Sequence, residues 1–314
     1  MPHFRDKSKG ERERALESAR QRAAAEAEVS VNALAAGGLP LSAERRLKEL
    51  RDGRLASSYL SVGEHALVRA AGYAPLAQVV GSAIYYVGFT LVLGSREMPA
   101  PTNALTRARS LALGRLEQEA DRVDADAVVG VRLTQRSYEW GSALGQGGAP
   151  ESAASSLIEF RAVGTAVRRR GGRSPHTGAR RILTNLSGQD LWKLERAGAR
   201  PLGLVAGTSV FYASGAGRGW QLTARDNIEV AHFTNGLSRE RGLAMNRLRS
   251  AAAQVSADGV VGVELVRESR EVGHSAIFVV HVLGTAIAQT RAAPQVSFVP
   301  ILDLGGSGAR PRTL

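Results

Sequence analysis

Six histidines are the first residues to test for chemistry, because imidazole is a common metal ligand and general base. No two of them stand three or four residues apart with a carboxylate alongside, the arrangement of helical zinc motifs. The chain has no cysteine, which excludes thiolate metal sites, thiol nucleophiles and disulfides. The sequence therefore predicts no metal site and no cofactor, and we expect ordinary surface or partly buried side chains at His3, His65, His176, His232, His274 and His281.

Two aspartates recur in the same local context. Asp126 and Asp258 each precede a Val-Val-Gly-Val run, and no second carboxylate recurs beside them. An acid–base or metal role needs further polar partners, whereas an aspartate in a turn needs only backbone amides. We expect Asp126 and Asp258 to be structural turn residues.

Three arginines recur as well, within a stretch of matching helical pattern. Their persistence predicts either a solvated or interface face paired with carboxylates, or a site for an anion such as phosphate or a lipid headgroup. Two tyrosines, Tyr86 and Tyr212, also coincide and join them as ligand or interface candidates. The arginines are Arg107, Arg109, Arg115, Arg239, Arg241 and Arg247.

These coincidences come from an internal repeat. Residues 71–81 align with 197–207, and the two blocks share a Pro-Leu step and an Ala-Gly or Val-Gly ending. Gly81 and Gly207 coincide, and because no phosphate-loop pattern follows them we expect a bulge or tight turn at each. Repeats at a fixed spacing indicate duplicated structural units, so the fold is predicted to occur twice.

Each repeat changes its hydrophobic period along its length. Residues 76–93 and 202–212 are rich in Val, Leu, Ile and Tyr, which predicts strand and hairpin. Apolar residues then recur every three or four positions, predicting one amphipathic helix with an N-cap at Thr102 or Thr234. Two β-rich segments follow and predict an antiparallel pair. The fold class is therefore α+β, with one helix packed on a small antiparallel sheet in each repeat.

A single helix cannot cover a sheet, so each unit is expected to finish its burial against another copy. The repeats could pair with each other, join a ring or paired ring, or both. We divide the chain into a charged helical segment (1–54), domain 1 (55–168), an Arg/Gly-rich linker (169–180), domain 2 (181–290) and a tail (291–314).

The chain carries a net charge of +12, with much of it in the linker and tail. Aromatic residues are 5% of the chain and none interleave with the linker arginines, so bases have nothing to stack on. Specific nucleic-acid binding is not expected. The N-terminus has no apolar signal region, and residues 76–93 are interrupted by glycine, so we predict no membrane span and a cytoplasmic location.

The repeated blocks resemble the YbjQ-like family, whose members are described as heavy-metal-binding domains. The resemblance rests on Pro-Leu-Gly-Leu-Val-Ala-Gly, on the helix from Thr102, on Asp-Ala-Val-Val-Gly-Val and on a closing Gly-Thr-Ala, and it covers about 55–168 and 181–288. It implies dodecin-subunit-like domains, ring assemblies that are often pentameric, and no established enzyme activity.

Relatives often read Cys-Val-Tyr-His after the shared glycine, where this chain has residues 83–86 and 209–212 without Cys or His. Both soft metal ligands are therefore missing. We expect a non-enzymatic, oligomeric binding and assembly module, with a small anionic ligand as a possible partner. The alternative is a heavy-metal-binding or metal-sequestering protein, as the resemblance suggests.

Overall fold

The computed structural model describes residues 3–52, 57–90, 94–139, 153–171, 181–215, 229–272 and 275–290. Its two repeats share one element order: a short helix, a long strand, a long helix and two more strands. Repeat 1 contains α3 (Val62–Ala70), β1 (Tyr73–Thr90), α4 (Pro99–Arg122), β3 (Ala127–Glu139) and β4 (Ala153–Arg169). Repeat 2 contains α5 (Gly188–Arg196), β6 (Ala199–Ala213), α6 (Ala231–Gln254), β7 (Gly259–Val272) and β8 (Ser275–Gln289). The predicted α+β tandem fold is confirmed.

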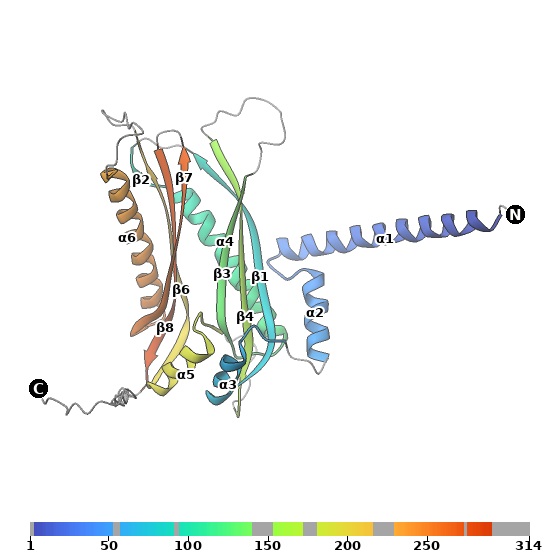
Figure 1. Cartoon of the computed structure of the whole chain (residues 1–314), viewed down its shortest axis with the longest axis horizontal. Helices are drawn as coiled ribbons and strands as arrows, with labels where there is room; N and C mark the ends of the chain where they lie inside the picture. The colour runs from blue at the N-terminus through green and yellow to red at the C-terminus, as the bar shows by residue number, and fades with distance from the viewer. Residues whose placement is uncertain are drawn as a thin grey trace, which may run out of the picture.

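Each repeat builds one sheet and lends a short strand to the other. The strand orders are β1-β4-β3-β5 and β2-β6-β8-β7. Strand β2 (Arg96–Glu97) comes from repeat 1 but pairs with β6, and β5 (Ile182–Leu183) precedes repeat 2 but pairs with β3. Figure 1 shows the two sheets upright beside each other, with α4 between them and α6 on the far side of the second sheet.

The predicted hairpin in residues 76–93 is wrong. Residues 73–90 form one strand of 18 residues, paired with β4 along its length, and residues 91–93 lie outside the described part. Gly81 and Gly207 do not turn the chain, because both lie inside regular ladders. A Cβ atom at either position would collide with the backbone of the long helix, at Ala112 or Ala244. These glycines let the helix approach its own sheet closely.

The long helices begin earlier than the sequence pattern suggested. Helix α4 has Met98 as its N-cap and a proline in its first turn, so Thr102 lies inside the helix. Helix α6 likewise begins after Val230, and Thr234 lies within it. Proline is favoured in the first helical turn because its missing N–H has no partner there in any case. The threonine N-caps are therefore wrong, although both helices exist as predicted.

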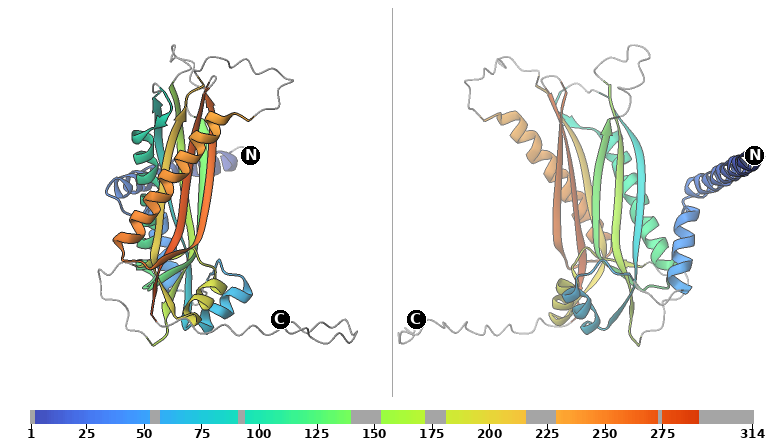
Figure 2. Two further views of the ribbon diagram at one scale, coloured as in Figure 1. Left: turned by 90° about the vertical axis from the view of Figure 1, so that its left-hand side faces the viewer. Right: turned by 45° about the vertical axis from the view of Figure 1, so that its right-hand side comes forward.

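A second, short helix precedes the first strand of each repeat. Ser61 and Glu64 form a capping box at the start of α3, and the Ser187 hydroxyl accepts a hydrogen bond from the Asp190 amide at the start of α5. The two short helices pack together below the sheets (Figure 2). A Cβ on Gly188 would come within 2.7 Å of the Glu64 carbonyl oxygen, so this contact is tight.

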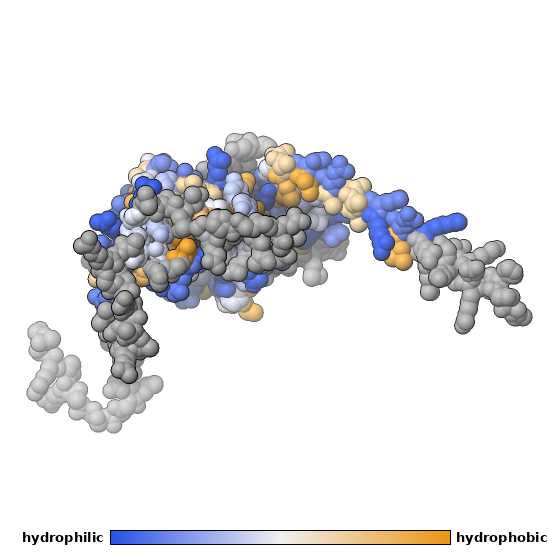
Figure 3. Space-filling model, turned by 90° about the horizontal axis from the view of Figure 1, so that it is seen from above, coloured by the Kyte–Doolittle hydropathy of each residue, from blue (hydrophilic) through white to orange (hydrophobic). Residues whose placement is uncertain are grey.

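The N-terminal helical segment is confirmed as two helices, α1 (His3–Ala35) and α2 (Leu41–Asp52). Leu47 of α2 is buried in the core of repeat 1, and Arg46 forms an ion pair with Glu119 of α4. Helix α1 projects from the body, and its side chains that the structure describes mix hydrophilic with scattered hydrophobic residues (Figures 1 and 3). Among the described residues, no helix has the length and apolar content to cross a membrane.

Candidate functional site at the joint between the repeats

Each sheet has a helix face, which its own long helix covers, and an outer face opposite. In β1 and β6 the helix face carries Gly81 and Gly207, and the alternating residues point outward. The outer face of repeat 2 packs onto the helix face of repeat 1, beside α4, and the shared core includes Leu105, Phe160, Val210, Tyr212, Ile277 and Val279. The two repeats thus meet head to tail.

The exchanged strands lock this joint through the backbone. At one end the amide of Met98 donates to the Val210 carbonyl at 2.8 Å, next to the β2–β6 pairing. At the other end the amide of Thr184 donates to the Val128 carbonyl at 2.9 Å, and the Gly130 amide to the Leu186 carbonyl at 3.0 Å. Each repeat therefore satisfies backbone groups along a short part of one edge of its neighbour.

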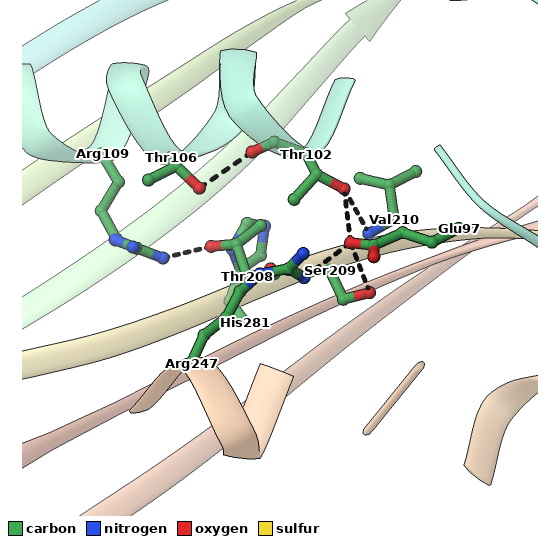
Figure 4. A network of polar contacts seen from close by, with 9 residues as sticks. All are labelled: Glu97, Thr102, Thr106, Arg109, Thr208, Ser209, Val210, Arg247 and His281. Atoms are coloured by element: carbon green, nitrogen blue, oxygen red, sulfur yellow. Dashed lines mark hydrogen bonds and ion pairs between the residues drawn. The ribbon is translucent and has the colours of Figure 1, made fainter. Parts of the chain in front are cut away.

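A buried polar cluster lies in the joint (Figure 4). The Arg109 guanidinium on α4 donates to the Thr208 hydroxyl on β6, and Thr208 also bonds Nδ1 of His281 on β8 at 3.0 Å. The His281 ring stands edge-on to Phe160, with ring centroids 5.4 Å apart. The cluster therefore joins α4 and sheet 1 to the outer face of sheet 2.

Burial shapes the charges in this cluster. Burial lowers the pKa of Arg109 to about 10, so the guanidinium stays charged at neutral pH. Burial, with a smaller contribution from the Arg109 charge, lowers the pKa of His281 to about 3, so the imidazole is neutral. A buried cation beside a neutral imidazole and a hydroxyl holds structure and could attract an anion, but it contains no activated nucleophile.

A second polar group binds the β2 segment to repeat 2. Glu97 pairs with Arg247 of α6 at 2.6 Å, and Arg247 also donates to the Thr208 carbonyl at 2.9 Å. The Thr102 hydroxyl accepts a hydrogen bond from the Val210 amide at 3.0 Å. Charged hydrogen bonds with several partners fix register as well as adding energy, so the loop before α4 is held in one place on β6.

The structure separates the six candidate arginines by role. Arg115 and Arg247 have the same local role, because each donates to a carbonyl of its own long strand, at Ser82 and Thr208. Arg109 is buried in the joint while its counterpart Arg241 is exposed on α6. Arg107 and Arg239 are exposed, on helices α4 and α6. The six arginines do not converge on one anion site in the described structure.

The other candidates also divide between the repeats. Tyr212 is buried in the joint, whereas Tyr86 is exposed on the outer face of repeat 1. Asp126 and Asp258 precede β3 and β7, and their carboxylates accept from the amides of Arg169 and Gln289 at 2.7 and 2.8 Å. These amides are distant in sequence, so the aspartates fasten the end of the closing strand to the turn.

Sequence reasoning missed Glu97, Thr208, His281 and the buried Glu240 of α6. Glu97 and Thr208 carry no motif, and their importance depends on the meeting of two repeats. Glu240 did leave a signal, because it occupies an apolar position in the row Gly236, Glu240, Ala244, Leu248 and Ala252. A carboxylate on the core side of a helix needs an explanation.

A cleft of about 330 Å³ opens between the two sheets on the side of β3 and β7. Its apolar floor includes Phe89 and Ile277, and Arg270 lies over the Phe89 ring at 5.4 Å. Glu268 accepts hydrogen bonds from Gln135 at 2.8 Å and Ser137 at 3.2 Å, which close part of the rim. The cleft could admit a small ligand. Within the described residues, no three His, Cys, Asp or Glu side chains are grouped to hold a metal ion.

Comparison with known proteins matches this duplicated architecture. The sequence pattern of the YbjQ family, described as "Putative heavy-metal-binding", matches residues 76–170 and 197–290, more than half of the chain. A Mycobacterium tuberculosis protein named as an encapsulin nanocompartment protein is 36% identical over 257 residues, covering 79% of this chain and 92% of that protein. The chain belongs to the YbjQ family and contains its domain twice.

Proposed function

We propose that the chain is a structural assembly unit whose copies join head to tail through a repeat of the joint inside the chain. One observation carries the proposal: equivalent residues are buried where a neighbouring repeat is present and exposed where it is absent. Val210 is 0% exposed and its counterpart Ile84 is 64% exposed. Tyr212 and Tyr86 differ in the same way, at 8% and 58%.

The complementary surface shows the same asymmetry. Val131 on the helix face of repeat 1 is 1% exposed, in a core against which Leu204 of repeat 2 packs, whereas its counterpart Val263 on repeat 2 is 46% exposed. Among the described residues, the outer face of repeat 1 and part of the helix face of repeat 2 therefore have no neighbouring repeat packed on them. Adjacent exposed apolar groups of this kind mark association sites, and these two faces are the counterparts of surfaces that already fit each other.

A head-to-tail contact repeats from copy to copy and either closes into a ring or continues as a filament. Since every chain supplies two repeats, a closed ring built this way holds an even number of them. Five repeats would correspond to two and a half chains, which cannot close into a ring. A ring with fivefold symmetry would therefore contain five whole chains and ten repeats.

The related Mycobacterium tuberculosis protein carries the name of a nanocompartment protein. We extend the proposal to the same setting: the assembled chain works as part of, or inside, a protein compartment in the cytoplasm. The absence of cysteine fits a reducing location. Fractionation of cells that produce the chain tests this proposal. We expect to recover the chain with large particles, and its recovery only as small free assemblies would contradict the proposal.

The assembly itself is tested by native mass spectrometry and sedimentation velocity on the full chain. We expect concentration-dependent species with whole numbers of chains, and a loss of association by about a hundredfold or more in Ile84→Asp, because this change puts an unpaired charge into the joint. Val31→Asp on α1 alters an equally exposed apolar residue, 61% exposed, and should assemble normally. A wild-type chain that stays monomeric would contradict the proposal.

A further inference from the structure

Glu240 is a carboxyl group in the core of repeat 2. Its side chain on α6 is fully buried, and within the described structure neither of its oxygens completes a hydrogen bond of ordinary length and angle. Burial raises the pKa of Glu240 to about 9, against weaker stabilisation of its charge by the Val280 backbone amide and Arg267. At neutral pH the free chain therefore holds this carboxyl group protonated.

The two repeats show what Glu240 replaces. Its counterpart in α4 is Ala108, which lies in a core with Ala83 and Phe160, a pair on adjacent strands. In repeat 2 the corresponding strand pair is Ser209 and Val280. Because Val280 is smaller than Phe160 and Glu240 is larger than Ala108, the exchange keeps the packed volume. It puts a carboxyl group where repeat 1 has an aromatic ring.

The residue that packs on Phe160 in the joint indicates which residue of a second copy would approach Glu240. In the joint inside the chain, His281 on the outer face of repeat 2 packs edge-on against Phe160. The residue equivalent to His281 on the outer face of repeat 1 is Arg161, which is exposed. A second copy docking as the repeats do would bring Arg161 to the surface above Val280 and Glu240. Because these residues are 1% and 0% exposed in the single chain, the guanidinium must enter the core to reach the carboxyl group.

We infer that Arg161 of one copy forms an ion pair with Glu240 of the next, and that this pair distinguishes the joint between copies from the joint within a chain. The inference rests on the proposed head-to-tail assembly. Inside the chain the same positions hold His281, whose imidazole is neutral, and Ala108, which has no charged group, so no ion pair forms there. A buried carboxyl group that gains a guanidinium only in the right complex supplies specificity for this pairing of surfaces.

The other charged groups near Glu240 do not supply that partner. Glu97 on β2 has the same sign and is paired with Arg247 of α6. Arg267 on β7 lies opposite Val280 and lowers the pKa of Glu240 less than burial raises it, but its side chain is exposed and forms no ion pair with Glu240 among the described residues. Arg239 and Arg241 of α6 are exposed. The strands below contribute the uncharged Ser209 and Val280. An arginine from another copy is therefore the complementary group that the site lacks.

The pair couples assembly to proton release. Glu240 is protonated in the free chain and ionised beside Arg161, so each joint releases one proton between neutral pH and about 9. The association constant measured by sedimentation velocity should rise by up to about tenfold per pH unit over this range. Glu240→Gln and Arg161→Gln should each flatten this slope and weaken association at pH 8 by about tenfold to a hundredfold.

Two controls keep the test specific. The double variant should associate no more weakly than either single variant, because the second change removes nothing further once the pair is broken. Arg45→Gln removes an exposed arginine of α2 that pairs with Glu26, away from the sheet face, and should associate as the wild type does. Thermal melts of the isolated chains at pH 7 should agree, since Glu240 is neutral there.

The outcomes separate this inference from the proposed function. If the wild-type chain assembles and Ile84→Asp does not, but both glutamine variants keep the wild-type affinity and pH slope, the ion pair is wrong and the assembly stands. If the wild type is monomeric across the pH range, both are wrong. Additive losses in the double variant would also contradict a direct contact between Arg161 and Glu240.

Discussion

Repeat 1 and repeat 2 have the same strand order, and in both the long helix packs closely on its own sheet at a glycine. Corresponding residues nevertheless differ in burial. The outer face of repeat 2 is buried and that of repeat 1 is open, while the helix face shows the reverse. The long helices follow the helix faces, because Arg109 of α4 is buried and its counterpart Arg241 of α6 is exposed. The burial of equivalent residues in this chain therefore depends on which repeat lies next to them.

The largest effects should separate the two outer faces. Val210→Asp puts a charge into the buried joint and should lower the free energy of unfolding by about 3–5 kcal/mol, because the carboxylate loses its water without gaining a partner. Ile84→Asp makes the same kind of change on the open face and should stay within about 0.5 kcal/mol. Urea unfolding under dilute, monomeric conditions compares them. Equal losses in the two variants would refute the asymmetry.

The two repeats should respond alike where their internal packing is the same. Gly81→Ala and Gly207→Ala each push a methyl group into the backbone of the long helix and should cost about 3 kcal/mol. Gly114→Ala in α4 and Gly242→Ala in α6 meet open space and should stabilise by about 0.5–1 kcal/mol, through helix propensity. Thermal or urea unfolding measures all four. A tolerated Gly207→Ala would show that repeat 2 lacks the close approach.

A smaller effect should follow from the buried imidazole of His281, for which repeat 1 has Arg161 at the equivalent position. The pKa of His281 is lowered to about 3 in the fold, so below about pH 6.5 the unfolded chain binds a proton that the folded chain does not. The free energy of unfolding should therefore fall by about 1 kcal/mol per pH unit from pH 6 to pH 4 because of this group. His281→Gln should reduce that slope. Identical slopes would mean that His281 is solvated.

The elements inside one repeat were largely predictable from sequence. The spacing of Leu105, Ala112 and Leu116 gave the long helix, and the valine runs gave the strands after it. The predicted start of the helix was wrong because the helix begins at Pro99 without a side-chain cap. The predicted hairpin was wrong because Gly81 allows α4 to approach β1 closely and does not turn the chain. The same residue type serves both purposes, and local sequence does not distinguish them.

The candidate site was less accessible to sequence reasoning, for a physical reason. Arg109 and Arg241 stand in similar local sequence, and only the arrival of repeat 2 against α4 buries the first. The exchanged strands β2 and β5 form only where the two repeats are in contact. Each has two residues, which are too few to give a periodic pattern in the sequence. Glu240 was visible as a charge in an apolar row, but its partner position becomes clear only when the two sheets are compared.

Engineered cysteines test most directly whether copies meet as the repeats do, because the sequence contains no cysteine of its own. Glu97 and Phe211 are paired residues of the β2–β6 ladder, and their counterparts in the next joint are Glu229 and Tyr85. Paired ladder positions lie within disulfide reach. Glu97→Cys/Phe211→Cys should form an intrachain disulfide as the positive control.

Mixing a Glu229→Cys chain with a Tyr85→Cys chain under mild oxidation should give a disulfide between the two copies, resolved by non-reducing mass spectrometry. Val266→Cys, on an exposed part of β7, replaces Glu229→Cys as the matched negative control. We expect a heterodisulfide that forms faster than in this control and that is lost in the Ile84→Asp background. No cross-link between Glu229→Cys and Tyr85→Cys, in a sample where the intrachain control closes fully, would contradict head-to-tail assembly.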